Sequence, residues 1–229
     1  MEDRIDTIGK GSMIQHGKLN DRIYLIKLGK KDCPKILDLL RNLALEHDYA
    51  KIFGKVPAWA APVFIADGFM TEAMIPGFYR GKEAAFFLAK YRDSDRLMNL
   101  EDQELEAFSD LLKDTHKKEK LPKKEGFKTR LLKPSDVEQI TDLYLKVFLS
   151  YPFPIHNPGY ILKTMKENVR YFGVRKKGKL IAVASAEIDA EGKNAEMTDF
   201  ATDPAFRGQK LGQKLLDHME KEMKAMGIK

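Results

Sequence analysis

The chain has 229 residues, of which 43% are hydrophobic and 32% charged, a composition typical of a globular protein with one large or two small domains. No apolar run reaches membrane-spanning length, and the first residues lack the apolar core of a signal peptide. The single cysteine, Cys33, excludes an internal disulfide and a cysteine cluster for a metal. We therefore expect a cytoplasmic protein with no metal and no membrane partner.

The net charge of +6 suits an anionic ligand, and it would also suit nucleic acid. No aromatic-interleaved basic stripe or zinc spacing accompanies it, so we expect no nucleic-acid partner. Part of the charge lies in the proline-containing segment Lys117–Gly126. Such a segment is typical of a solvated linker, with a partner-binding patch as the alternative. It predicts a boundary between residues 1–116 and residues 127–229.

The N-terminal part alternates strands and helices after an extended arm or short strands over residues 1–21. We expect Asp32 to cap the first helix, with Pro34 in its first turn. Periodicity and turn residues predict these elements: strand Arg22–Leu28, helix Asp32–Asp48, strand Lys51–Val56, helix Ala58–Ala66, strands Met70–Ile75 and Ala84–Lys90 around a Pro76-Gly77 turn, and helix Leu100–His116.

The C-terminal part begins with strand Phe127–Leu132 and a helix for which Ser135 and Glu138 have capping-box spacing. Tyr151-Pro152-Phe153-Pro154 ends that helix. The remaining predicted elements are a short helix at Tyr160–Lys166, a hairpin of Val169–Arg175 and Leu180–Ile188 around Lys177-Gly178, and a strand that starts at Asn194.

The stretch from Asn194 to Met226 predicts a strand, a turn with two glycines and a long amphipathic helix. One apolar stripe follows the helical period: Leu211, Leu215, Met219, Met223 and Met226. A turn of this kind exposes the first N–H groups of the helix, which favour an anion such as phosphate.

The turn resembles the acyl-CoA-binding motif of the GNAT acetyltransferases. It stands here as Arg207-Gly208-Gln209-Lys210-Leu211-Gly212, preceded by Asp203-Pro204. The alternative is an ordinary glycine-containing entry to a helix. The motif's first glycine is Lys210, whose amide can still donate if its φ is negative. The resemblance implies that these six residues bind the pyrophosphate of acetyl-CoA, and that the backbone of Phe200, Ala201 and Thr202 contacts the thioester oxygen.

The order of elements extends the resemblance to the fold. The C-terminal part follows the first half of a GNAT domain, and the N-terminal part resembles the second half. We expect an α/β (α+β) GNAT acyl-CoA N-acyltransferase fold with a mixed, mostly antiparallel sheet, preceded by a GNAT-like half domain. A GNAT domain continues past its phosphate helix, whereas this chain stops at Gly227-Ile228-Lys229. We expect its C-terminal strands to be absent, or supplied by the N-terminal part within the chain or across a homodimer.

A more specific resemblance, to the β-lysine N-acetyltransferases, covers nearly the whole chain. The segments that carry it are Ser12 with Gln15–Gly17, Asn20–Tyr24, Lys51–Phe53, Lys55–Pro57, Glu72-Ala73, Ile75–Tyr79, Tyr151–Ile155 and Glu196–Gly212. It implies transfer of acetyl from acetyl-CoA to a small-molecule amine, β-lysine, to make the osmolyte Nε-acetyl-β-lysine. A silent acyl-CoA-binding regulatory module, or an enzyme for another small amine, is the alternative.

The reaction needs a general base, because an ammonium must lose a proton before it attacks a thioester. Glu196 is the first catalytic candidate and Asp199 the second. Strict alternation would put Glu196, Thr198 and Phe200 on one sheet face and Asp199 on the other, unless the strand has a bulge. Either carboxylate could instead hold a substrate ammonium or cap the sheet. The resemblance places Tyr151 and Phe153 in the acceptor site, with aromatic packing as the alternative.

Overall fold

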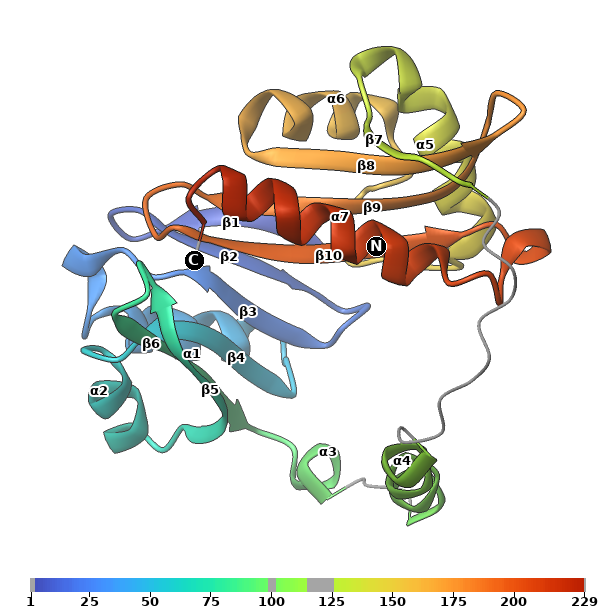
Figure 1. The fold of residues 1–229 in the computed structure, drawn as a ribbon. Coiled ribbons are helices and arrows are strands. Elements are labelled where there is room, and N and C mark those ends of the chain that lie inside the picture. Colours follow the sequence, from blue (N-terminus) through green and yellow to red (C-terminus); the bar gives the residue numbers. More distant parts are fainter. Residues whose placement is uncertain (1–2, 99–101, 115–125, 229) are drawn as a thin grey trace. The chain divides into compact units, whose positions relative to one another are not determined.

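The computed structural model describes residues 3–98, 102–114 and 126–228 (Figure 1). The chain divides into two compact units, residues 1–75 with 85–122 and residues 76–84 with 123–229. Apart from Gly126, the predicted linker Lys117–Gly126 lies outside the described residues.

The first unit contains a six-stranded sheet in the order β1-β2-β3-β4-β6-β5. β3 and β4 pair in parallel, and the chain passes from one to the other through α1. The elements are β1 Arg4–Ile8, β2 Ser12–Gly17, β3 Arg22–Lys27, η1 Lys30–Asp32, α1 Ile36–Glu46, β4 Lys51–Pro57, α2 Ala61–Ala66, β5 Met70–Tyr79, β6 Glu83–Tyr91, α3 Ser94–Met98 and α4 Asp102–Asp114. The predicted order of strand, helix, strand, helix, strand, strand is confirmed.

Two details of that prediction are wrong. β5 continues through Pro76 and Gly77 to Tyr79, because it is an edge strand and an edge tolerates a residue without an N–H donor. Asp32 does not cap α1, which begins at Ile36. Its buried carboxylate instead accepts hydrogen bonds from the Lys10 N–H at 2.6 Å and the Ser12 hydroxyl at 2.7 Å, and so it joins the β1–β2 turn to the segment after β3.

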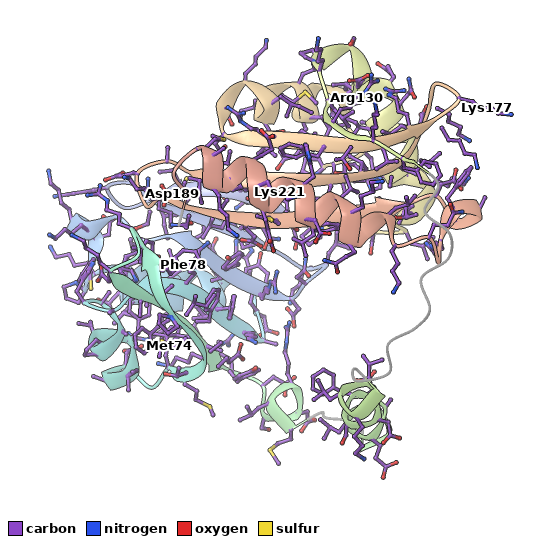
Figure 2. The ribbon with its side chains drawn as sticks, viewed as in Figure 1. Met74, Phe78, Arg130, Lys177, Asp189 and Lys221 are labelled. Atoms are coloured by element: carbon purple, nitrogen blue, oxygen red, sulfur yellow. The ribbon has the colours of Figure 1, made fainter. Side chains whose placement is uncertain are left out.

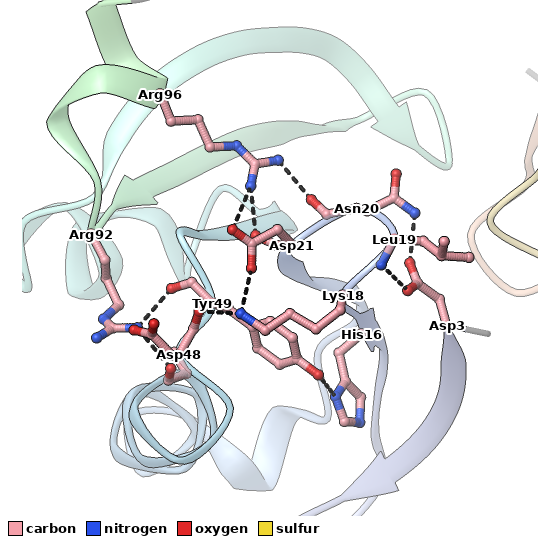
Figure 3. Close-up of polar contacts among 11 residues, drawn as sticks. Asp3, His16, Lys18, Leu19, Asn20, Asp21, Asp48, Tyr49, Arg92 and Arg96 are labelled. Carbon is pink, nitrogen blue, oxygen red and sulfur yellow. Dashed lines mark hydrogen bonds and ion pairs between the residues drawn. The ribbon is translucent and has the colours of Figure 1, made fainter. Parts of the chain in front are cut away.

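A buried aspartate ties the start of the first unit together (Figure 3). Asp3 accepts hydrogen bonds from the side chains of Gln15 and Asn20, each at 2.6 Å, and from the Leu19 N–H at 3.1 Å. Gly17 must be glycine, since a Cβ there would lie 1.9 Å from Asp3 Oδ1. Several residues that carry the specific family resemblance therefore hold this unit's fold.

The second unit is a four-stranded antiparallel sheet in the order β10-β9-β8-β7. Its elements are β7 Thr129–Leu131, η2 Pro134–Asp136, α5 Val137–Val147, α6 Pro158–Glu167, β8 Val169–Lys176, β9 Lys179–Asp189, β10 Asn194–Thr202, η3 Pro204–Phe206 and α7 Leu211–Ala225. The β8–β9 hairpin turns at Lys177 and Gly178 as predicted, both with positive φ (Figure 2). The predicted sequence of elements is confirmed.

Helices cover both faces of this sheet (Figure 1). α5 and α6 pack on one face around Ile140, Tyr144 and Val183, and α7 packs on the other through its predicted stripe of Leu211, Leu215, Met219 and Met223; Met226 is exposed. The predicted Ser135–Glu138 capping box is wrong, because a short 3-10 turn, Pro134–Asp136, precedes α5, and it is the Asp136 carboxylate that accepts the Lys133 N–H at 2.8 Å.

Candidate active site

A β-bulge interrupts β10 where the predicted site residues lie. Thr198 is opposite Ser185 on β9 and Ala201 is opposite Val183, so two residues of β10 face one residue of β9. Asp199, one of those two, has a φ of 55°, in the left-handed region. A bulge bends the strand and changes which face its side chains take. Strict alternation therefore ends at Asp199, through the bulge that was named as the exception.

The bulge brings Asp199 to the face covered by α5 and α6. Its carboxylate is buried and accepts a hydrogen bond from the Ser185 hydroxyl at 2.6 Å and another from the Tyr151 hydroxyl. Ser185 and Glu187 are two positions apart on β9, and Glu196 is the Cα partner of Glu187. Glu196 thus belongs to the same sheet face as Asp199, and it is exposed.

Tyrosines surround this carboxylate. Burial, followed by the charges of Glu187 and Asp199, raises the pKa of Tyr160 to about 12. Burial raises the pKa of Tyr151 and Tyr171 as well, with the Asp199 charge acting in the same direction on both. Such hydroxyls stay protonated at neutral pH and can donate hydrogen bonds. The hydroxyl of Tyr144 is buried and has no hydrogen-bond partner within the described part of the chain.

The chain leaves β10 through a turn anchored by Asp203. Its buried carboxylate contacts Lys146 Nζ at 2.8 Å and Lys179 Nζ at 3.7 Å, and accepts the Ala205 N–H at 3.1 Å. The hydrogen bond from Lys146 is the main cause that lowers the pKa of Asp203. This anchor fixes the start of the turn that leads to α7.

The turn fits an anionic diphosphate. Arg207, Gly208, Gln209 and Lys210 are exposed, α7 has no acidic residue in its first turn, and no side chain caps it. A Cβ on Gly212 would meet nothing within 4 Å, so the surface beside the helix start is open. Uncapped N–H groups, the helix dipole and two cations all favour phosphate. Lys210 has a φ of 56° rather than the negative value expected, a left-handed conformation that glycine adopts more readily than lysine.

The two residues predicted for the acceptor site have different surroundings. Tyr151 contacts Asp199 directly, whereas Phe153 is partly buried against the core of α5 and α6. Sequence reasoning missed Ser185. The available signal was a hydroxyl within the apolar run of β9, Leu180–Ala186, where a buried polar side chain needs a partner.

Within residues 3–98, 102–114 and 126–228, no three His, Cys, Asp or Glu side chains are grouped so that they could hold a metal ion. None of the helices there is long and apolar enough to cross a membrane.

Known proteins match both parts of the chain. The acetyltransferase (GNAT) family matches residues 137–229. A beta-lysine N(6)-acetyltransferase of Methanococcus maripaludis is 35% identical over 218 residues, which cover 95% of this chain and 79% of the relative. The N-acetyltransferase YodP of Bacillus subtilis is 30% identical over 96% of this chain and 79% of its own. A beta-lysine N(6)-acetyltransferase of Methanosarcina mazei is 33% identical over 68% of this chain and 65% of its own.

Among solved structures, the PaiA N-acetyltransferase of Thermoplasma acidophilum in complex with coenzyme A has a TM-score of 0.39 at 20% identity, over 45% of this chain and 75% of that one. The sequence relatives establish that the chain belongs to the GNAT acetyltransferase family. The predicted family and fold are confirmed, and the chain is an N-acetyltransferase that uses acetyl-CoA.

Proposed function

We propose that this chain transfers the acetyl group of acetyl-CoA to the ε-amino group of β-lysine and so forms the osmolyte Nε-acetyl-β-lysine. The observation that carries the proposal is the 35% identity, over 95% of the chain, to a relative named as a beta-lysine N(6)-acetyltransferase. That alignment includes both units, whereas the broad family matches residues 137–229 alone. A second relative of the same name supports the same acceptor.

In this proposal Glu196 is the general base. It is exposed and lies on the same sheet face as the bulge, so solvent or substrate can reach it. It accepts the proton that the substrate ammonium must lose, directly or through water. The amine then forms a C–N bond to the acetyl carbon, the C–S bond breaks, and the sulfur leaves with a proton as the CoA thiol.

The donor side uses the bulge and the turn after it. Acetyl-CoA supplies an acetyl group activated as a thioester. The N–H groups of Arg207–Gly212, with the side chains of Arg207 and Lys210, hold its pyrophosphate. The backbone of Phe200, Ala201 and Thr202 holds the thioester oxygen. What supports this assignment is the exposed, uncapped start of α7 and the interruption of the β9–β10 ladder.

The acceptor side carries negative charge, which suits a substrate with two ammonium groups. Glu187 and Glu196 are Cα partners across β9 and β10, and Asp199 lies further along the same face. Carboxylates gathered on one sheet face attract a cationic ligand. Tyr151 and Phe153 shape the acceptor site beside these carboxylates.

We place the enzyme in the cytoplasm, as a monomer or homodimer without nucleic-acid or membrane partners.

The test is CoA-thiol release by this chain with acetyl-CoA and a panel of β-lysine, lysine and Nε-acetyl-β-lysine. We expect kcat/KM for β-lysine to exceed that for lysine by about tenfold or more, the discrimination that a few placed polar contacts give. The ε-blocked compound should be inactive. Equal or faster turnover of lysine would reject β-lysine as the preferred acceptor. Turnover of the ε-blocked compound would reject the ε-amine as the reacting group.

A further inference from the structure

Asp199 has a backbone conformation that a residue with a side chain avoids unless its surroundings impose it. Its φ of 55° lies in the left-handed region, where aspartate and asparagine are tolerated better than other non-glycine residues. Such conformations persist where neighbouring contacts determine them, and they gather at functional sites. The contacts of the Asp199 carboxylate therefore bear on why the bulge exists.

Hydroxyl groups from separate elements hold that carboxylate. Ser185 on β9 donates to Oδ2 at 2.6 Å, and Tyr151, in the loop after α5, donates to Oδ1. The Thr198 hydroxyl lies 3.4 Å from Oδ1. Asp199 is 9% exposed and Ser185 is fully buried. No ion pair involves Asp199 within the described residues, so hydroxyl donors alone compensate its burial.

We infer that Asp199 is a positioning residue rather than the base. Ser185 and Tyr151 lock its carboxylate, and this lock fixes the bulge that presents the backbone N–H groups of Phe200–Thr202. The inference rests on the proposed function, which assigns those groups to the thioester oxygen. Both carboxylate oxygens already accept a hydroxyl hydrogen in a buried place, whereas a base must receive a proton from the substrate or from water. Glu196 is exposed, so substrate or water can reach its side chain.

The test compares Ser185→Ala and Tyr151→Phe, which each remove one hydroxyl of the lock. Tyr171→Phe is the matched control, because its buried hydroxyl lies 3.0 Å from that of Thr164, and the hydroxyls hydrogen-bonded to Asp199 are instead those of Tyr151, Ser185 and Thr198. The first readout is the infrared carbonyl stretch of acetyl-CoA bound without an amine. We expect the wild type and the control to lower this frequency relative to free acetyl-CoA, and the two lock variants to lower it less.

A second readout needs no ligand. Amide hydrogen exchange at residues 199–202 should accelerate in both lock variants, while amides of β8 keep wild-type rates. If the carbonyl frequency and these exchange rates equal the wild-type values in both variants, the lock does not exist. If wild-type protein binds acetyl-CoA without shifting its carbonyl band, the bulge does not contact the thioester and the inference is wrong.

Kinetics separate positioning from proton transfer. In the lock variants we expect kcat to fall about tenfold, less than the 100- to 1000-fold loss that follows removal of a donor outright. KM for the amine should stay unchanged in Ser185→Ala, because Ser185 is not part of the proposed acceptor site. Asp199→Asn keeps an acceptor oxygen and tolerates positive φ, so it should retain more activity than Asp199→Ala and keep the ascending limb of the pH profile. Glu196→Gln should lose that limb. If Asp199→Asn loses the ascending limb of the pH profile and is as inactive as Asp199→Ala, Asp199 is the base.

The infrared and exchange measurements use no acceptor amine. A failure of β-lysine as the acceptor would therefore leave the lock intact, and a failure of the lock would leave the acceptor assignment intact.

Discussion

Lys210 holds a position where the family motif has glycine, and its backbone is in the left-handed region that favours glycine. With a φ of 56°, the residue bears the cost of the left-handed region, about 1 kcal/mol for a side chain with a Cβ. It also places a cation beside the exposed start of α7. The charge of Lys210 thus favours anion binding, whereas its backbone conformation lowers the stability of the fold.

Two substitutions separate these effects. Lys210→Ala removes the charge and keeps the cost, whereas Lys210→Gly removes both. We expect the glycine variant to be more stable than the alanine variant by about 1 kcal/mol in urea unfolding. Both should bind acetyl-CoA more weakly than wild type, by similar factors, in calorimetric titration. Equal stability of the two variants would show that the backbone at this residue relaxes without cost.

Residue-level prediction from the sequence succeeded where local pattern decides and failed where a distant partner decides. The strand, the turn and the apolar stripe of α7 follow from spacing alone. The face of Asp199 does not, because its conformation depends on Ser185 and Tyr151, which are 14 and 48 positions away. Strict alternation of side chains takes no account of such distant partners. The sequence could therefore name a bulge only as the exception that would move Asp199 to the other sheet face.

At the scale of elements, Asp203 links β10 to η3 and through it to α7. Its pKa is lowered, chiefly by the hydrogen bond from Lys146. A carboxyl with a lowered folded-state pKa stabilises the protein above its unfolded value, about 3.9, and that stabilisation is lost as the pH falls through the folded value. The second unit should therefore lose stability progressively as the pH falls below about 4.

The measurement is the midpoint of urea unfolding from pH 6 down to about pH 3, near and below the ordinary carboxyl pKa. Asp203→Asn should be less stable than wild type at the upper end and show a weaker pH dependence. Asp217→Asn is the control, because that exposed carboxylate on α7 contacts Gln213 on its own helix. If Asp203→Asn and wild type have the same pH dependence, the Lys146 contact does not stabilise the fold.

Element boundaries show the same division between local and distant causes. The alternating pattern of Arg22–Leu28 predicted β3 to within one residue. The Pro76-Gly77 pair predicted a turn but lies within β5, because tolerance of proline depends on the strand's place at the sheet edge. Asp32 precedes a helical pattern and is a good N-cap by type. Its carboxylate instead accepts hydrogen bonds from Ser12 and Lys10, which lie 20 and 22 positions away.

At the scale of the whole molecule, each unit has its own buried core. We propose that the two units are separate domains and that they unfold in separate transitions. Gly17→Ala tests this, since the added Cβ would lie 1.9 Å from Asp3 Oδ1 and 2.7 Å from Asp3 Cα. Overpacking of this kind costs about 2 kcal/mol.

In calorimetry we expect Gly17→Ala to lower the midpoint of one transition only, and saturating acetyl-CoA to raise the midpoint of the other only. Gly126→Ala is the control, because a Cβ there would meet nothing within 4 Å. A single transition that shifts with both perturbations would contradict separate domains.

The most direct test of the central claim is the structure of the product formed from β-lysine and isotopically labelled acetyl-CoA. Nuclear magnetic resonance can correlate the labelled acetyl carbonyl with the methylene or methine next to the acylated nitrogen. The account predicts a single product, labelled at the ε-nitrogen, whose formation Glu196→Gln strongly slows. Label at the β-nitrogen, or binding of acetyl-CoA with no acetylated β-lysine, would contradict it.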